Sequence, residues 1–204
     1  MLIRKVCVFC ASSDLSDSIY LDAAKELGEI LAQKSIHIVY GGGSSGSMGM
    51  LANGALSKGG KVTGIIPKFM DDLEWGHDSL TELRFVETMN ERKEQMILNT
   101  DAAIALPGGS GTFEELFDTI TLKRLGFYLS PIVFINIKGF FNPCLELLEK
   151  AIEEKFMDPR SKDMWTVINN PSEIIEAITS APKWSKDAVK FASLKKGLSK
   201  KLNN

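Results

Sequence analysis

Short apolar segments alternate with longer, helix-like segments along most of this chain, and no other feature restricts its fold as strongly. Segments such as AAIALP and PIVFINI are apolar throughout, which is typical of strands covered on both faces. We expect strands at residues 5–9, 37–40, 62–66, 84–86, 102–106, 132–137 and 165–168. We expect helices at residues 20–33, 48–57, 91–98, 112–125, 143–155 and 171–179. This order predicts an α/β fold, a single domain in which a parallel sheet is flanked by helices on both faces.

The strand–helix alternation stops about 20 residues before the end of the chain. The 204 residues suffice for one α/β domain with a core, which we expect to span residues 1–182. Residues 183–204 contain seven lysines and one acid, which makes them a basic C-terminal tail of charge about +6. Apolar residues recur in this tail at Phe191, Leu194, Leu198 and Leu202. A solvated terminal helix is expected, with a membrane surface or nucleic acid as the alternative partner.

Apolar run lengths and cysteine content indicate the compartment. No run reaches the roughly 18 apolar residues of a membrane span, and MLIRKVCVFCASS becomes polar too soon for a signal peptide. The three cysteines, Cys7, Cys10 and Cys144, are few and odd in number, as in a reducing compartment. We therefore expect a cytoplasmic protein. Cys7 and Cys10 form an isolated CxxC pair, for which core packing is expected rather than redox or metal chemistry.

Ligands of such sheets bind where strands end and helices begin. The first such turn, residues 9–14, carries hydroxyl groups, among them Ser13, that either contact a ligand or cap the next helix. The second turn contains GGGSSG at residues 41–46, which matches the dinucleotide pattern GxGxxG. That pattern needs an acid after the next strand, and residues 62–68 contain none, so NAD is not expected. Gly42 and Gly43 can still let backbone N–H groups approach a ligand.

The third turn, LPGGSGTFEE at residues 106–115, predicts a phosphate site. A strand runs into three glycines and a threonine, and a helix begins at once. Unpaired N–H groups and the helix dipole attract an anion there. No lysine follows the last glycine, unlike in a Walker A loop, so one phosphate is favoured over a triphosphate. The residues concerned are Gly108, Gly109, Ser110, Gly111 and Thr112.

Charged residues near this turn are candidates for catalysis. Glu115 lies about one helical turn beyond Thr112. A phosphate would repel its carboxylate, so Glu115 is expected to face the sugar, where positive charge develops during glycosidic cleavage. Glu114 is expected to interact only with the helix dipole. Arg92 and Lys93 either hold phosphate or keep a carboxylate ionised, or they belong to a solvated helix face.

Three motifs together resemble the Lonely Guy (LOG) proteins, which are cytokinin riboside 5′-monophosphate phosphoribohydrolases. The motifs are YGGG followed by Met48-Gly49, then Met89-x-x-Arg92-Lys93, then PGGxGTxxE ending at Glu115. The resemblance runs from about residue 5 to about residue 178. It implies a Rossmann-like fold, no metal, no cofactor, and a homodimer or higher oligomer with the site near the subunit interface.

The resemblance also implies roles for individual residues. It makes Arg92 and Glu115 the catalytic pair and residues 109–112 the phosphate ligands. It places Glu74, Lys93 and Thr121 beside the ligand. The turns and motifs add further candidate substrate-binding residues, namely Ser13, Gly42, Gly43, Met89 and Gly108.

The expected reaction is hydrolysis of the N-glycosidic bond of a purine ribonucleoside 5′-monophosphate, such as AMP or an N6-modified, cytokinin-type derivative. Free base and ribose 5-phosphate are the products. The alternative is a non-catalytic nucleotide sensor or carrier; nucleic acid is not an expected partner. Asn90 and Leu122 replace a histidine and a tryptophan that are frequent in the family, which leaves base preference and oligomer size open.

The predicted helix at 112–125 bears on the oligomeric state. It carries more apolar side chains than one buried face needs, which favours a dimer. These side chains are Phe113, Leu116, Phe117, Ile120 and Leu122.

Overall fold

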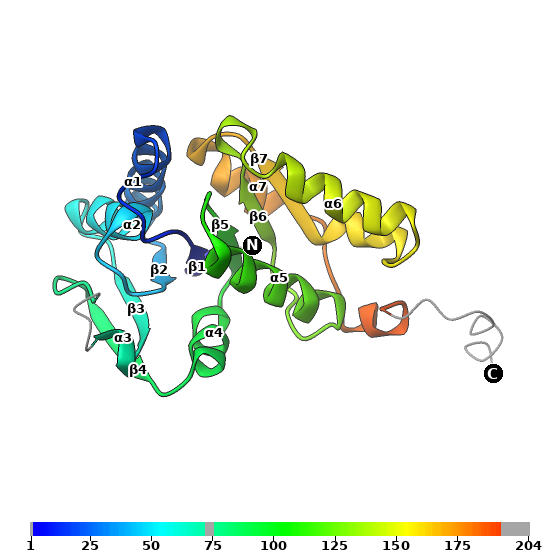
Figure 1. Ribbon diagram of the computed structural model, residues 1–204, viewed down its shortest axis with the longest axis horizontal. Coiled ribbons are helices and arrows are strands. Elements are labelled where there is room, and N and C mark those ends of the chain that lie inside the picture. The colour runs from blue at the N-terminus through cyan, green and yellow to red at the C-terminus, as the bar shows by residue number, and fades with distance from the viewer. Residues whose placement is uncertain (1, 72–75, 193–204) are drawn as a thin grey trace.

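The strands form one parallel, seven-stranded sheet in the order β4-β3-β2-β1-β5-β6-β7. A computed structural model describes residues 2–71 and 76–192 (Figure 1). The strands are β1 (Lys5–Phe9), β2 (His37–Tyr40), β3 (Val62–Pro67), β4 (Glu82–Val86), β5 (Ala102–Ala105), β6 (Ile132–Ile135) and β7 (Trp165–Ile168). The predicted α/β fold class with a parallel sheet is confirmed.

Helices connect consecutive strands. The α-helices are α1 (Ser18–Gln33), α2 (Gly46–Ser57), α3 (Lys68–Asp71), α4 (Met89–Ile97), α5 (Ser110–Arg124), α6 (Asn142–Glu153) and α7 (Ile174–Ser180). Short 3-10 turns are η1 (Ile137–Gly139), η2 (Pro159–Met164), η3 (Pro171–Glu173) and η4 (Lys186–Lys190). The helix α3 was not predicted, since four residues give no periodicity.

Several predicted boundaries were wrong by a few residues. The helices α2 and α5 each begin two residues earlier than predicted, because Gly46 and Ser110 already adopt the helix. The helix predicted from residue 171 starts as the 3-10 turn η3. Ile137 was expected to end β6 but lies in η1. Glycine and proline near a helix end make its first turn hard to place from sequence alone.

Alternate strand residues pack against different helices, so the sheet is covered on both faces. Val6 and Val8 of β1 belong to a core with α1, α2 and α7. Cys7 and Phe9 belong to a second core with α4, α5 and α6. In Figure 1, α1 and α2 lie together on one side of the sheet, and α4 and α5 lie on the other. This explains why the strands are apolar throughout.

The chain reverses its direction of strand addition at β1. The strands β2, β3 and β4 are added on one side of β1, whereas β5, β6 and β7 are added on the other. The helices α1 and α5, which follow β1 and β5, cover opposite faces. Their starting turns therefore separate and leave a crevice beyond the carboxyl ends of these strands.

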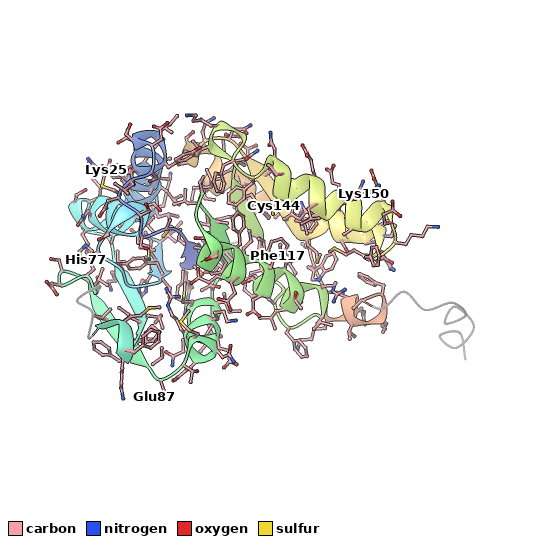
Figure 2. The ribbon with its side chains drawn as sticks, in the orientation of Figure 1. Lys25, His77, Glu87, Phe117, Cys144 and Lys150 are labelled. Atoms are coloured by element: carbon pink, nitrogen blue, oxygen red, sulfur yellow. The ribbon has the colours of Figure 1, made fainter. Side chains whose placement is uncertain are left out.

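The apolar side chains of α5 that favoured a dimer pack in part within the chain itself. Leu116 and Ile120 are buried in the second core, and Phe113, Phe117 and Leu122 pack against it. Figure 2 shows Phe117 and Cys144 in the region of α5 and α6, whose side chains share that core. Phe113, Phe117 and Leu122 remain partly exposed, and the expected dimer stays a prediction.

The first part of the basic tail packs against the domain. Trp184 Nε1 donates to the Lys123 carbonyl at 2.6 Å, and Ala188 is buried. The Arg160 guanidinium stacks 3.6 Å from the centre of the Phe191 ring. The division at residue 182 stays a prediction, but packing continues beyond it. The predicted helical positions Leu194, Leu198 and Leu202 lie outside the described residues. Within residues 2–71 and 76–192, no helix is long and apolar enough to span a membrane.

Candidate active site

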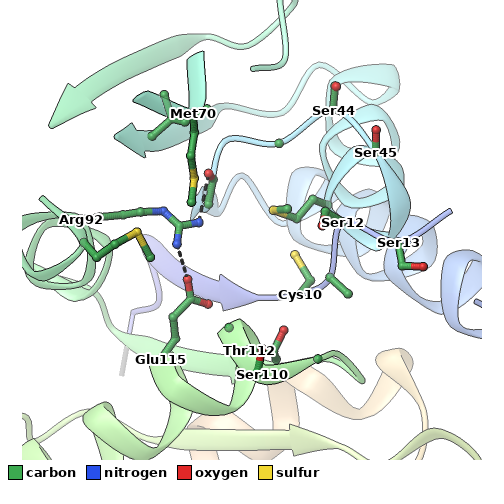
Figure 3. Close-up of a pocket in the computed structure, with 18 residues that line it drawn as sticks. Cys10, Ser12, Ser13, Ser44, Ser45, Met70, Arg92, Ser110, Thr112 and Glu115 are labelled. Atoms are coloured by element: carbon green, nitrogen blue, oxygen red, sulfur yellow. Dashed lines mark hydrogen bonds and ion pairs between the residues drawn. The ribbon is translucent and has the colours of Figure 1, made fainter. Parts of the chain in front are cut away.

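A cavity of about 520 Å³ opens at the crevice where the direction of strand addition changes, a volume typical of small-molecule sites. Its walls come from the ends of β1, β2, β3 and β5 and from α2, α3, α4 and α5. Serines 12, 13, 44, 45 and 110 supply hydroxyl groups, and Cys10, Met48, Met70 and Met89 supply sulfur atoms. Among the residues that the structure describes, Arg92 and Glu115 are the charged ones in its lining (Figure 3).

The start of α5 offers backbone donors to this cavity. Its N-cap is Gly109, which provides no side-chain cap. Phe113 N donates to the Gly109 carbonyl at 3.0 Å, so the N–H groups of the three preceding residues have no acceptor within the helix. A side chain at Gly108 would lie 2.2 Å from Thr112 Oγ1, whereas Gly109 faces open space. The turn can therefore approach an anion closely, as the sequence predicted.

The start of α2 differs, because the protein itself occupies its donors. Gly46 N donates to Asp14 Oδ1 at 2.6 Å, and Met48 N donates to the Ala11 carbonyl at 3.0 Å. The Ser47 hydroxyl accepts from Ala11 N and donates to the Ala11 carbonyl. These bonds join the turn after β1 to α2 and occupy backbone donors that a bound pyrophosphate would need.

Arg92 and Glu115 form a buried ion pair between α4 and α5. Arg92 Nη1 donates to Glu115 Oε1 at 2.8 Å, and the residues are 7% and 6% exposed. Arg92 Nε donates to the Ile65 carbonyl at 3.0 Å, and Nη2 donates to the Gly41 carbonyl at 3.2 Å. Figure 3 shows Glu115 pointing from α5 into the cavity towards Arg92. Every nitrogen of the guanidinium is thus bound within the protein.

The environment of Glu115 changes its acidity. Burial raises the pKa of Glu115 to about 7, and the nearby Arg92 guanidinium opposes part of this rise. A carboxylate with a pKa near 7 can exist in either protonation state under physiological conditions. Burial also raises the pKa of the neighbouring Cys10 thiol, which therefore stays protonated at neutral pH.

Most predicted ligand-site residues line the cavity, but several do not. Ser13, Gly43, Met89 and residues 109–112 line it. Gly42 and Gly108 shape the turns without lining it. Thr121 is exposed farther along α5 and does not line the cavity. Glu74 lies outside the described residues.

Glu114 was placed wrongly from sequence, whereas the ligand role of Lys93 stays a prediction. Lys93 Nζ binds Glu114 Oε1 at 2.6 Å and does not line the cavity. Because α5 begins at Ser110, neither Glu114 nor Glu115 lies in its first turn. Glu114 is therefore the ion-pair partner of Lys93 rather than a partner of the helix dipole.

Sequence reasoning missed several lining residues. Met48 stands in the glycine motif and could have been found, but Met70 lies on the unpredicted helix α3. Cys10 was assigned to core packing; it is buried and also forms part of the cavity wall. Within the described part of the chain, no group of three or more His, Cys, Asp or Glu residues could hold a metal ion.

Comparisons with known proteins cover most of the chain. Residues 48–178 match a family described as "Possible lysine decarboxylase". The chain is 39% identical to cytokinin riboside 5′-monophosphate phosphoribohydrolase LOG3 of Arabidopsis thaliana, over 86% of this chain and 81% of the relative. It is 36% identical to LOG4 of the same plant, with the same activity in its name, over 93% of each chain.

A solved structure shares the fold. The molybdenum cofactor binding protein from the phototrophic bacterium Rippkaea orientalis superposes with a TM-score of 0.65, covering 88% of this chain and 98% of that chain. The two sequences are 21% identical, so this similarity concerns the fold alone.

Proposed function

Because the chain belongs to the LOG family of cytokinin riboside 5′-monophosphate phosphoribohydrolases, we propose that it hydrolyses the N-glycosidic bond of a purine ribonucleoside 5′-monophosphate. Water adds to C1′ of the ribose, and the bond from C1′ to the base nitrogen breaks with its electrons on the base. One proton of the water ends on the base and the other stays on the new C1′ hydroxyl. Free base and ribose 5-phosphate are released.

The observation that carries this proposal is a buried carboxylate in the same cavity as an anion-binding turn. The uncapped start of α5 would hold the 5′-phosphate, which anchors the ribose away from the reacting bond. The Glu115 carboxylate then stabilises the positive charge that develops at C1′, or activates the attacking water. Among the described residues that line the cavity, Glu115 is the one carboxylate.

Arg92 has the role of orienting Glu115 in this proposal. Its three nitrogen positions already bind Glu115, Ile65 and Gly41. Three of the five guanidinium N–H groups, one on each nitrogen, are thus engaged within the protein. These contacts fix the guanidinium and support a role in holding the carboxylate.

Substrate anchoring by phosphate is the first prediction. AMP is expected to release adenine, and adenosine should react at least 10²-fold more slowly in kcat/KM, because it lacks the anchoring group. Chromatographic detection of adenine measures both reactions. Comparable turnover of the two compounds would argue against a phosphate anchor.

A sensor or carrier is the competing function, and the same assay separates it from an enzyme. Such a protein needs the glycine turns but not Glu115. Tight AMP binding without release of adenine would favour it over hydrolysis.

N6-modified AMP is the finer part of the substrate proposal. Met48, Met70, Met89 and Ile66 give part of the cavity an apolar wall, and methionine adapts to varied apolar groups. We infer that the site accepts a cytokinin-type nucleotide as well as AMP. The ratio of kcat/KM for N6-isopentenyl-AMP and AMP measures this preference.

The pH dependence of kcat/KM should follow the ionisation of Glu115. Its raised pKa of about 7 leaves the carboxyl group protonated below that pH, and a neutral carboxyl stabilises developing positive charge poorly. We expect kcat/KM to level off above pH 7 and to fall about tenfold per pH unit below it. The substrate phosphate is protonated near pH 6, which makes the fall steeper below that pH. In Glu115→Gln the fall that begins at pH 7 should disappear, whereas the one that begins near pH 6 should persist. A rate that rises on acidification below pH 7 would instead make Glu115 a proton donor.

A homodimer or larger oligomer also belongs to the proposal, and it rests on family membership. The chain has a mass of 22.5 kDa. Light scattering at micromolar concentration should therefore give at least twice that mass. A fully active monomer would contradict this part of the proposal.

We place the protein in the cytoplasm on the basis of its cysteines. Cys7, Cys10 and Cys144 are all free, as expected in a reducing compartment. Nucleic acid and membranes have no part in the proposed reaction.

A further inference from the structure

The guanidinium of Arg92 is held by two backbone carbonyls, one just after β2 and one within the neighbouring strand β3. Gly41 follows β2 directly, and its carbonyl accepts from Nη2 at 3.2 Å. Ile65 lies in β3, and its carbonyl accepts from Nε at 3.0 Å. With Nε and Nη2 held in this way, Nη1 donates to Glu115 Oε1 at 2.8 Å. The direction of the ion pair is thus set by the backbone of the sheet.

The position of Gly41 has no room for a side chain. A Cβ atom there would lie 2.1 Å from Arg92 Nη2 and 3.3 Å from its Cζ, with Met48 Sδ at 3.1 Å. Gly41 is not among the residues with positive φ, so its backbone conformation would permit alanine. The requirement for glycine is therefore the space that the guanidinium fills.

The other carbonyls of this turn are also held by the protein. The His77 N–H donates to the Gly42 carbonyl at 3.1 Å, and the buried Tyr40 hydroxyl donates to the Gly43 carbonyl at 3.0 Å. Three successive carbonyls are thus bound to donors of the protein itself. The turn is fixed, and the Gly41 carbonyl cannot easily follow a displaced Arg92.

We propose that Gly41 is a positioning residue for hydrolysis: its missing side chain leaves the space for the Arg92 guanidinium, and its carbonyl aims that guanidinium at Glu115. The inference rests on the proposed function, in which Glu115 faces the reacting sugar. Gly41 acts through Arg92 and not on the substrate.

Gly41→Ala should reduce kcat more than it changes KM. Displacing the guanidinium by about 1 Å misorients Glu115, and misplacement of that size costs about 10²-fold in rate. Arg92 lowers the pKa of Glu115, so a displaced guanidinium should raise that pKa. The fall of kcat/KM on acidification should therefore begin at a higher pH than in the parent protein. Other charged groups act on Glu115 as well, namely Lys93 from α4 and Glu114 from its own helix. Cys7 of β1 and Cys10 just after it lie nearby as neutral thiols.

Gly43→Ala is the matched comparison in the same turn. Its new Cβ would meet Met48 Cε at 2.7 Å, the end of a flexible side chain, and Arg92 is not among its nearest neighbours. Because Gly43 lines the cavity, this variant can change KM. The pH at which its kcat/KM begins to fall on acidification should be the same as in the parent protein.

A carbon-13 NMR titration of the Glu115 carboxyl tests the positioning directly and needs no turnover. The resonance is assigned by its absence in Glu115→Gln. The titration midpoint should be higher in Gly41→Ala than in the parent protein and unchanged in Gly43→Ala. An unchanged midpoint in Gly41→Ala overturns the inference, whatever its activity. If the midpoint shifts but the parent protein releases no adenine, Gly41 still positions Arg92, and it is the proposed hydrolysis that is refuted.

A rescue variant covers the case in which Gly41→Ala folds poorly. Lysine at position 92 has no Nη2 atom, so the 2.1 Å contact with the new Cβ disappears. Gly41→Ala combined with Arg92→Lys should then regain a cooperative unfolding transition close to that of Arg92→Lys alone. Failure of this rescue would show that Gly41 is needed for a reason other than Arg92.

Discussion

Replacing Glu115 by glutamine is expected to lower kcat for AMP by about 10²–10⁴, the usual contribution of a positioned acid or base. That corresponds to roughly 3–5.5 kcal/mol of lost transition-state stabilisation. The substitution keeps the size of the side chain and an oxygen that can accept from Arg92 Nη1, but it removes the charge that would face C1′. Nucleotide affinity should hold or rise slightly, since a carboxylate near the bound phosphate repels it. Single-turnover kinetics and equilibrium binding of AMP measure the two quantities separately.

The neighbouring acid provides the control. Glu114 is the partner of Lys93 on the more exposed side of α5 and does not line the cavity. Glu114→Gln should therefore hydrolyse AMP at close to the parent rate. If Glu115→Gln were equally active, the assignment of Glu115 as the catalytic carboxylate would be wrong, although the phosphate site could remain.

Replacing Arg92 by methionine is expected to reduce both activity and stability. It leaves Glu115 without its ion-pair partner and removes the donors to the Gly41 and Ile65 carbonyls. Breaking a buried ion pair costs about 3–5 kcal/mol of unfolding free energy. We expect the lower end, about 3 kcal/mol, because Glu115 can take up a proton. The rate should fall at least about 10²-fold at neutral pH, since the protonated carboxyl is inactive in this mechanism.

Denaturant unfolding and the pH profile together test this prediction. Lys93→Met is the control, because it breaks the adjacent ion pair between the same two helices. Its partner Glu114 has a half-exposed side chain, and exposed pairs contribute about 0–1 kcal/mol. Raising the pH should partly restore activity in Arg92→Met by ionising Glu115. Equal stability losses in the two variants, with no recovery at high pH, would contradict the orienting role of Arg92.

The contrast between the two glycine turns shows where sequence reasoning needs the structure. Both turns precede helices and both contain hydroxyl residues, so composition alone does not rank them. In the structure, Asp14 and Ala11 occupy donors at the start of α2, while the start of α5 has no cap. The partner Asp14 comes from a different strand-to-helix turn, 32 positions away. Only tertiary packing could show which turn keeps its donors.

Periodicity and turn chemistry are local properties, so the sequence by itself determined the parallel α/β sheet, the turn at 108–112 and the family-specific residues Arg92 and Glu115. Contacts between distant segments were decided by the order of the strands and the packing of α4 against α5. Arg92 meets Glu115 across 23 positions and Gly41 across 51. Such sequence separations follow no periodic pattern, and the burial that raises the pKa of Glu115 arises only when the chain folds around it. The pairing of Lys93 with Glu114 and the space reserved by Gly41 likewise depend on atoms that come together only in the folded protein.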